Sequence, residues 1–260
     1  MTDVKKGKVL FMEGRHSEAV RIFYAAAADG DAEGAFDYAF CKQFGFGTEK
    51  DYKSARSFYN FAKERIADAS YNLAVMHLHA EGVARDYRAA AEYMRDAAVG
   101  GVIEAQLYLA VAHTMGTLFE PDIIAISHLP YHTPISRDAS LMLDGEVPDS
   151  EEDEEARIRA VRFDPNAAFE WFRVAASHDS TYVEALSTQS KYLYARCFVD
   201  GLGVDFDRKR AEDLMLIAAS DGSPDALAYL ETNAPYRLPE LDSTEALGKI
   251  RMVERLPEKT

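Results

Sequence analysis

The chain has 260 residues, of which 48% are hydrophobic and 28% are charged. This composition is typical of a globular protein that buries a sizeable core. The 44 acidic residues outnumber the 29 basic ones, so the formal net charge is −15. The charge argues against a general binder of nucleic acids or anionic membranes, because both of these partners require basic patches that neutralise phosphate.

The first residues carry no sign of export, since residues 1–6 lead into neither a long apolar segment nor a cleavage motif. No run approaches eighteen apolar residues, so no segment is expected to cross a membrane. Cys41 and Cys197 lack C-x-x-C spacing, and no disulfide is expected between them. These features predict a cytoplasmic protein with no membrane partner.

An internal repeat organises the chain. In chain order there is a half copy at residues 19–30, full copies at 34–62 and 69–101, a copy split between 105–116 and 164–176, and a full copy at 190–222. Successive equivalent alanines are 36, 35, 78 and 43 residues apart, namely Ala19, Ala55, Ala90, Ala168 and Ala211. These steps are typical of helical solenoids, and the step of 78 is one unit enlarged by an insertion of about 42 residues.

Each copy is predicted to form two helices around a glycine-rich turn, because apolar residues recur at intervals of three and four. Glycines at the turn are expected to end the first helix, since glycine accepts a positive φ at little cost. An aspartate is placed to cap the second helix in four copies, and these aspartates are Asp51, Asp86, Asp164 and Asp207. Pro165 follows its aspartate at the first helical position, where proline is favoured.

These copies resemble the Sel-like repeat family, a relative of the tetratricopeptide repeat. Residues 69–101 match the family pattern almost throughout, although Ala80 replaces the first glycine. The usual tyrosine of the first helix is replaced in three copies, by Lys42, His77 and His113. The resemblance implies an all-α fold, an α/α superhelical solenoid of about five to six helix-turn-helix repeats. It also implies a non-catalytic scaffold or adaptor for protein–protein interaction, of the kind used in bacterial regulation or secretion.

The expected organisation is a solenoid over residues 1–234 and a C-terminal capping segment over 235–260. A long insertion of about residues 117–163 interrupts one repeat, and its acidic stretch covers about 144–155. Such a long segment in a solenoid is typically functional or disordered, and we expect its apolar part to fold back on the solenoid. In the tail, Ser243 can cap a helix whose apolar stripe covers the open end of the last repeat, with a dimerisation helix as the alternative.

The first helix of each repeat is expected to present a concave face rich in aromatic and aliphatic side chains. Aromatic, Met and Arg residues are the types enriched at the centres of protein interfaces. Three explanations stay open: burial between neighbouring first helices, cover by the insertion, and an exposed groove for a partner. The candidate partner-binding residues are Phe40, Phe44, Tyr71, Asn72, Val75, His79, Tyr108, Val111, Met115, Tyr192 and Arg196.

The preferred function is a scaffold that binds another protein or a peptide, with the acidic surface favouring a basic partner. An alternative is an acidic protein that neutralises a basic protein or imitates nucleic acid. A weaker alternative is a metal-dependent hydrolase that uses histidines, of which His77, His79, His113, His128 and His132 are the candidates. No clustered metal-ligand motif, phosphate-binding loop or nucleophile motif is present, so no cofactor and no catalytic residue are predicted.

Overall fold

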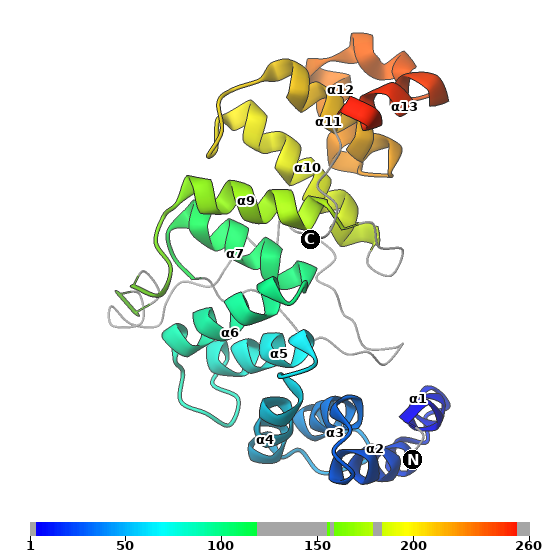
Figure 1. Ribbon diagram of the computed structural model, residues 1–260, viewed down its shortest axis with the longest axis vertical. Helices are drawn as coiled ribbons and strands as arrows, with labels where there is room; N and C mark the ends of the chain where they lie inside the picture. The colour runs from blue at the N-terminus through cyan, green and yellow to red at the C-terminus, as the bar shows by residue number, and fades with distance from the viewer. Residues whose placement is uncertain (1–3, 119–154, 157–158, 179–183, 254–260) are drawn as a thin grey trace. The chain divides into compact units, whose positions relative to one another are not determined.

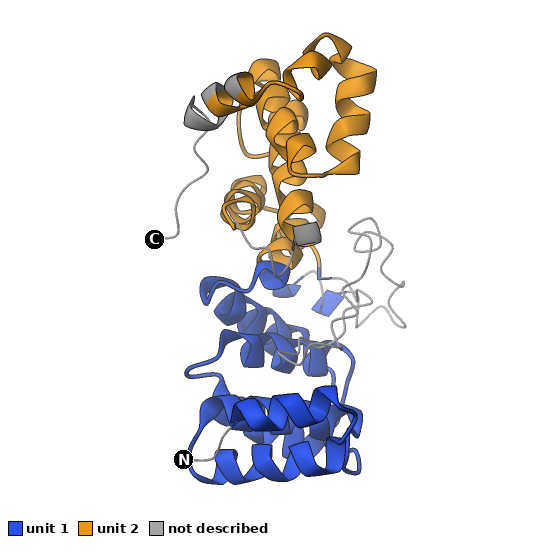
Figure 2. Cartoon of the chain, turned by 90° about the vertical axis from the view of Figure 1, so that its right-hand side faces the viewer, with its two compact units in different colours: residues 1–105, 118–161 blue, residues 106–117, 162–260 orange. Residues whose placement is uncertain are grey.

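A computed structural model describes residues 4–118, 155–156, 159–178 and 184–253. All of its regular elements in these ranges are helices (Figure 1). Most of the predicted insertion, its acidic stretch and the last residues of the tail lie outside the described residues. The chain divides into unit 1, with residues 1–105 and 118–161, and unit 2, with residues 106–117 and 162–260 (Figure 2).

Unit 1 is a series of helices in which each packs on the next along the chain. Its helices are α1 (Val4–Met12), α2 (His16–Ala28), α3 (Ala32–Phe44), α4 (Tyr52–Ala62), α5 (Ala67–Leu78) and α6 (Tyr87–Val99). The N-terminal half copy was expected to contribute a second helix only, but α1 completes the pair with α2. The sequence pattern does not reveal α1, which lacks the repeat residues and instead seats Gly7 against the ring of Phe23.

Unit 2 continues the same plan. The boundary between the units falls within α7 (Ile103–Met115), and the helices that follow are α9 (Pro165–Ala176), α10 (Glu184–Asp200), α11 (Arg208–Ser220) and α12 (Pro224–Asn233). Helices α9 to α12 each pack on the next. Neighbouring helix pairs in both units therefore confirm the predicted all-α solenoid fold.

One hydrogen bond defines the repeat at atomic level. The backbone N–H of each capping aspartate donates to a carbonyl on the first helix of its pair: Asp51 to Lys42, Asp86 to His77, Asp164 to His113 and Asp207 to Phe198. Each aspartate side chain also accepts from a backbone N–H of the helix that it opens, which confirms the four predicted caps. The bond between His113 and Asp164 spans the insertion and measures 3.0 Å, so the split copy closes as the intact copies do.

The second glycine of each turn holds consecutive repeats together. A Cβ atom on Gly47 would overlap the backbone of His16, where α2 begins, and one on Gly203 would overlap the Pro165 carbonyl, where α9 begins. Both glycines also have a φ of 67°. Glycine is needed here because the turn of one repeat lies directly against the second helix of the repeat before it.

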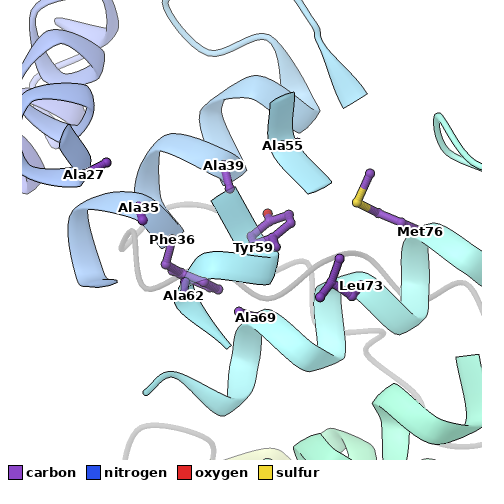
Figure 3. Packing of buried hydrophobic residues seen from close by; sticks show 10 residues of the cluster. All are labelled: Ala27, Ala35, Phe36, Ala39, Ala55, Tyr59, Ala62, Ala69, Leu73 and Met76. Atoms are coloured by element: carbon purple, nitrogen blue, oxygen red, sulfur yellow. The ribbon is translucent and has the colours of Figure 1, made fainter. Parts of the chain in front are cut away.

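One core cluster of unit 1 combines small and large side chains from neighbouring helices. Figure 3 shows Tyr59 from α4 surrounded by alanines of α3, α4 and α5 and facing Leu73. The ring is fully buried, and its hydroxyl donates to Gln43 at 2.9 Å. Gln43 in turn donates to Glu81 at 2.6 Å, so the buried polar groups are satisfied across two repeats.

The C-terminal segment packs against α11. A 3₁₀ helix, η3 (Pro235–Glu240), and α13 (Thr244–Val253) both contact it. Arg237 donates to Asp213 at 2.6 Å and to Glu240 at 2.5 Å, and Ser243 caps α13 through the N–H of Ala246 at 3.2 Å. A helix is therefore present where the capping helix was predicted, and η3 is an addition that the sequence pattern did not indicate.

Candidate protein-interaction surfaces

The predicted partner-binding residues lie on the first helix of each pair: α3 and α5 in unit 1, and α7 and α10 in unit 2. These helices are the more deeply buried of each pair. In the pair of α3 and α4, nine of the thirteen residues of α3 are buried, whereas only three of the eleven residues of α4 are. The first helix is more buried because it is apolar on most of its sides and packs against the helix before it and the helix after it.

Most of the predicted residues are consequently inaccessible. Six of them are buried, with at most 7% of their surface exposed: Phe40, Tyr71, Asn72, Val75, Tyr108 and Val111. Tyr71 and Tyr108 belong to different units and are both almost completely buried. Truncating either ring would leave a cavity in the packed interior, so these two residues support the fold directly.

The other five predicted residues remain accessible. Phe44 and His79 are half-buried in unit 1. In unit 2, Met115 is 43% exposed, and Tyr192 and Arg196 are half-buried. These residues are the part of the predicted surface that another molecule can touch without unfolding the repeat.

Tyr192 and Arg196 form an ordered pair on α10. The guanidinium of Arg196 donates to the Tyr192 hydroxyl at 3.2 Å and to the Asp200 carboxylate at 2.8 and 3.1 Å. Burial by itself would lower the pKa of Arg196, but the bonds to Tyr192 and Asp200 raise it, so the side chain stays cationic. The three residues lie at i, i+4 and i+8, on one face of α10. They present a ring, a cation and an anion together.

Unit 1 carries a second accessible surface that the sequence analysis did not identify. Three rings from α2, α3 and α4 lie against one another: Tyr24 and Tyr38 have centroids 5.1 Å apart, and Tyr38 and Phe58 have centroids 4.7 Å apart. Tyr24 is 53% exposed, and the Lys42 ammonium lies 5.8 Å from the Tyr38 ring centre. We call Tyr24, Tyr38 and Phe58 the aromatic surface.

The signal for the aromatic surface was present in the repeat pattern. Phe58 is the first member of an aromatic pair whose second member, Tyr59, fills the core. The repeat pattern by itself does not distinguish the roles of the two rings. Only the packing shows that Phe58 stays half-buried and meets two further rings at the surface. Burial and the nearby Tyr24 raise the pKa of Tyr38, which keeps its hydroxyl protonated.

The candidate metal ligands among the described residues make other contacts. His77 stacks on Tyr93 with centroids 5.6 Å apart, and burial lowers its pKa. In unit 2, the Nδ1 atom of His113 lies 3.0 Å from the Arg162 carbonyl. His128 and His132 lie outside the described residues. Among the residues that the structure describes, no group of three or more His, Cys, Asp or Glu side chains could hold a metal ion.

The two cysteines are both free and buried, one in each unit. Burial raises the pKa of the Cys197 thiol to about 12 and that of Cys41 further, so both are protonated at neutral pH. A protonated, inaccessible thiol is a poor nucleophile and a poor metal ligand. Within the described ranges, none of the helices is long and apolar enough to span a bilayer.

Comparison with known proteins supplies an independent line of evidence. The family model described as Sel1 repeat matches residues 32–65, 67–101, 160–180 and 188–223. A crystal structure of a Sel1 repeat protein from Oxalobacter formigenes aligns with 84% of the chain at 21% identity and a TM-score of 0.61. The alignment covers 49% of that protein, so the chain spans about half its length.

A second crystal structure aligns more loosely. It is a protective antigen with an SLR fold, present in uropathogenic Escherichia coli strains, and it covers 99% of the chain and 65% of its own length. Its identity is 17% and its TM-score 0.41. No curated protein matches the chain.

Proposed function

The chain belongs to the Sel1 repeat family, whose members are generally scaffolds for protein–protein interaction, and we propose that it is a non-catalytic scaffold binding a partner protein or peptide on the concave face. The binding residues are the accessible members of the predicted set. They are Phe44 and His79 in unit 1, and Met115, Tyr192 and Arg196 in unit 2.

The observation that carries the proposal is the ordered pair of Tyr192 and Arg196. Tyrosine and arginine are among the residue types that contribute most binding energy at interfaces. Here the hydrogen bonds to Asp200 and between the two side chains favour the paired conformation before any partner arrives. Less conformational entropy is therefore lost on binding than with two free side chains.

The context we propose is bacterial regulation or secretion, with the protein in the cytoplasm. The Sel1 repeat protein from Oxalobacter formigenes is bacterial, and the free, buried cysteines are compatible with a reducing compartment. The net charge of −15 would favour encounter with basic partners through long-range steering.

Partner capture tests the proposal. Tagged protein is incubated with a lysate of the source cells, and bound proteins are identified by mass spectrometry for the wild type and for the double variant Tyr192→Ala/Arg196→Ala. We expect the specific partner to be lost from the variant, because two adjacent anchors are removed. Unchanged thermal melting by circular dichroism would show that the variant is folded.

The comparison variant is Tyr24→Ala/Phe58→Ala, which removes two rings of the aromatic surface. Retained capture by this variant, together with loss in the α10 variant, supports the concave face. Loss of capture in Tyr24→Ala/Phe58→Ala, with capture retained in the α10 variant, would overturn the concave face as the binding site in favour of the aromatic surface. Absence of any partner specific to the wild type would overturn the scaffold proposal itself.

A further inference from the structure

Unit 1 contains a basic pocket that differs in character from the rest of this acidic protein. It has a volume of about 680 Å³ and is lined by the start and first turns of α6 and by residues near 156–160. Four arginines line it, Arg85, Arg88, Arg95 and Arg159, and we call it the arginine pocket. Its size falls within the range of sites that enclose a small ligand or a few side chains.

The charge balance in the arginine pocket is the reverse of that in the whole chain. Four arginines face only two lining carboxylates, Asp86 and Glu92, whereas the chain as a whole has 44 acidic and 29 basic residues. Asp86 is engaged as the cap of α6, where it accepts from the N–H of Ala89 at 3.0 Å. Glu92 pairs with Arg88 at 3.3 Å. Glu155, which pairs with Arg159 at 2.7 Å, is a third carboxylate near the four arginines, so the pocket keeps an excess of one positive charge.

The arginines can rearrange toward a ligand. The side chain of Arg88 is 88% exposed and that of Arg159 is 78% exposed. Their pairs with Glu92 and Glu155 are exposed salt bridges, which contribute little and exchange readily. Arg95 donates to the Ala160 carbonyl at 3.5 Å, a long bond that a carboxylate would replace favourably.

One side chain that lines the pocket, Tyr87, is buried. Tyr87 is 4% exposed, and its hydroxyl accepts from Arg85 at 3.4 Å. Tyr87 is also the first residue of α6, so the start of that helix, which Asp86 caps, lines the same space. A fixed ring, a helix start and several guanidinium groups together make a site suited to anions.

We propose that the arginine pocket binds an acidic peptide segment of a partner protein, through two or more of its carboxylates. Guanidinium groups bind carboxylates with paired, parallel hydrogen bonds, and the pocket offers several at once. The pocket is separate from the residues of the proposed concave face, so the two proposals stand or fall independently. The overall negative charge does not prevent binding, because charges further away than about 8 Å are screened at physiological salt.

The test is the binding of a fluorescently labelled hexaglutamate peptide, followed by anisotropy, with hexaglutamine as the neutral control peptide. The pocket variant is Arg88→Glu/Arg95→Glu. The matched control is Arg21→Glu/Arg65→Glu, which reverses two exposed arginines of unit 1 outside the pocket. We expect the pocket variant to bind at least about tenfold more weakly than the wild type, and the control to stay within about twofold.

Three results would overturn the proposal. The first is equal weakening by both variants, since binding would then depend on the general field alone. The second is equal affinity for hexaglutamine. The third is displacement of the peptide by inorganic phosphate at lower concentration than by acetate, which would make the pocket a phosphate site.

Competition from the chain's own acidic residues is controlled separately. Residues 149–154 include five acidic side chains and directly precede Glu155. The assay is therefore repeated with these five changed to their amides. The proposal is supported if the wild type or the amide variant binds hexaglutamate and loses this binding when Arg88 and Arg95 are changed to glutamate. The proposal is overturned if neither protein binds hexaglutamate.

Discussion

Ala80 adopts the left-handed backbone conformation that its repeat position demands, with a φ of 55°. The equivalent residues of two other repeats are Gly45 and Gly201, with φ values of 80° and 67°. An alanine in this region costs about 1–2 kcal/mol, because its Cβ atom approaches the following carbonyl oxygen. The turn geometry of the repeat therefore overrides the preference of this residue.

Replacing Ala80 by glycine should stabilise the protein. The strain is removed, while glycine loses more entropy on folding, so the expected net gain is about 0.5–1 kcal/mol in the free energy of unfolding. Urea denaturation followed by circular dichroism measures the change. Ala25→Gly, the same change inside α2, should instead destabilise by about 1 kcal/mol. A loss of stability in Ala80→Gly would contradict the strain argument.

Glu104 shows how burial alters a single charge. It lies in the first turn of α7, and burial, with Asp68 nearby, raises the pKa of its carboxyl from 4.5 to about 7. The helix N-terminus favours an ionised carboxylate, yet the cost of removing that charge from water dominates here. The protonated form is thus favoured by folding.

The stability contribution of Glu104 should depend on pH in a defined direction. The favourable contribution is complete below pH 4.5 and is lost as pH rises through about 7, because the folded state then has to hold the charge. Glu104→Gln should therefore raise the free energy of unfolding by about 1–3 kcal/mol at pH 8 and leave it nearly unchanged at pH 4.5. Denaturation at both values measures this. The exposed Glu92→Gln is the control, and a gain for Glu104→Gln that is equal at both values would argue against a buried charge.

At the scale of the elements, each helix pair is completed by contacts outside itself. The turn between α10 and α11 has two glycines, Gly201 and Gly203, both with a φ of 67°. A Cβ atom on Gly201 would have only the Val204 carbonyl nearby, at 3.8 Å, whereas one on Gly203 would overlap the start of α9. The two positions share a backbone conformation that would strain any other residue, and they differ in what a side chain there would touch.

This pair of glycines separates backbone strain from packing between repeats. Gly201→Ala should lower the free energy of unfolding by about 1–2 kcal/mol, from strain alone. Gly203→Ala should lower it by about 1–3 kcal/mol more, because the new methyl group forces α9 and the turn apart. Chemical denaturation of both variants measures the difference. Equal losses would show that the close approach at Gly203 contributes nothing to stability.

At the scale of the whole molecule, an acidic chain carries local surfaces of other kinds. The aromatic surface and the arginine pocket both lie in unit 1, and the ordered pair on α10 lies in unit 2. None of them is visible in composition, which reports only the sum of charges. A solenoid permits this variety because each repeat keeps its core positions and varies the rest.

The fold was readable from the sequence because the repeat signals are local. Alanine spacing, glycine turns and aspartate caps each act within one helix pair, and four capping aspartates form the predicted bonds. Helix α1 was missed because it lacks those residues. The split copy was predicted to continue across the insertion because both halves keep the repeat pattern. The hydrogen bond between Asp164 and His113 joins these halves in the structure.

The accessible sites were decided by the tertiary structure. The apolar faces of α5 and α7 suggested partner-binding residues, but Tyr71 and Tyr108 are buried once neighbouring segments are in place. Burial depends on every segment that packs around a side chain, whereas helix formation and capping depend on residues a few positions apart. The sequence alone therefore determined the repeat and its helices, which depend on local residues. Only the folded chain brought Arg85, Arg95 and Arg159 around one pocket, because residues far apart in the sequence have to meet there.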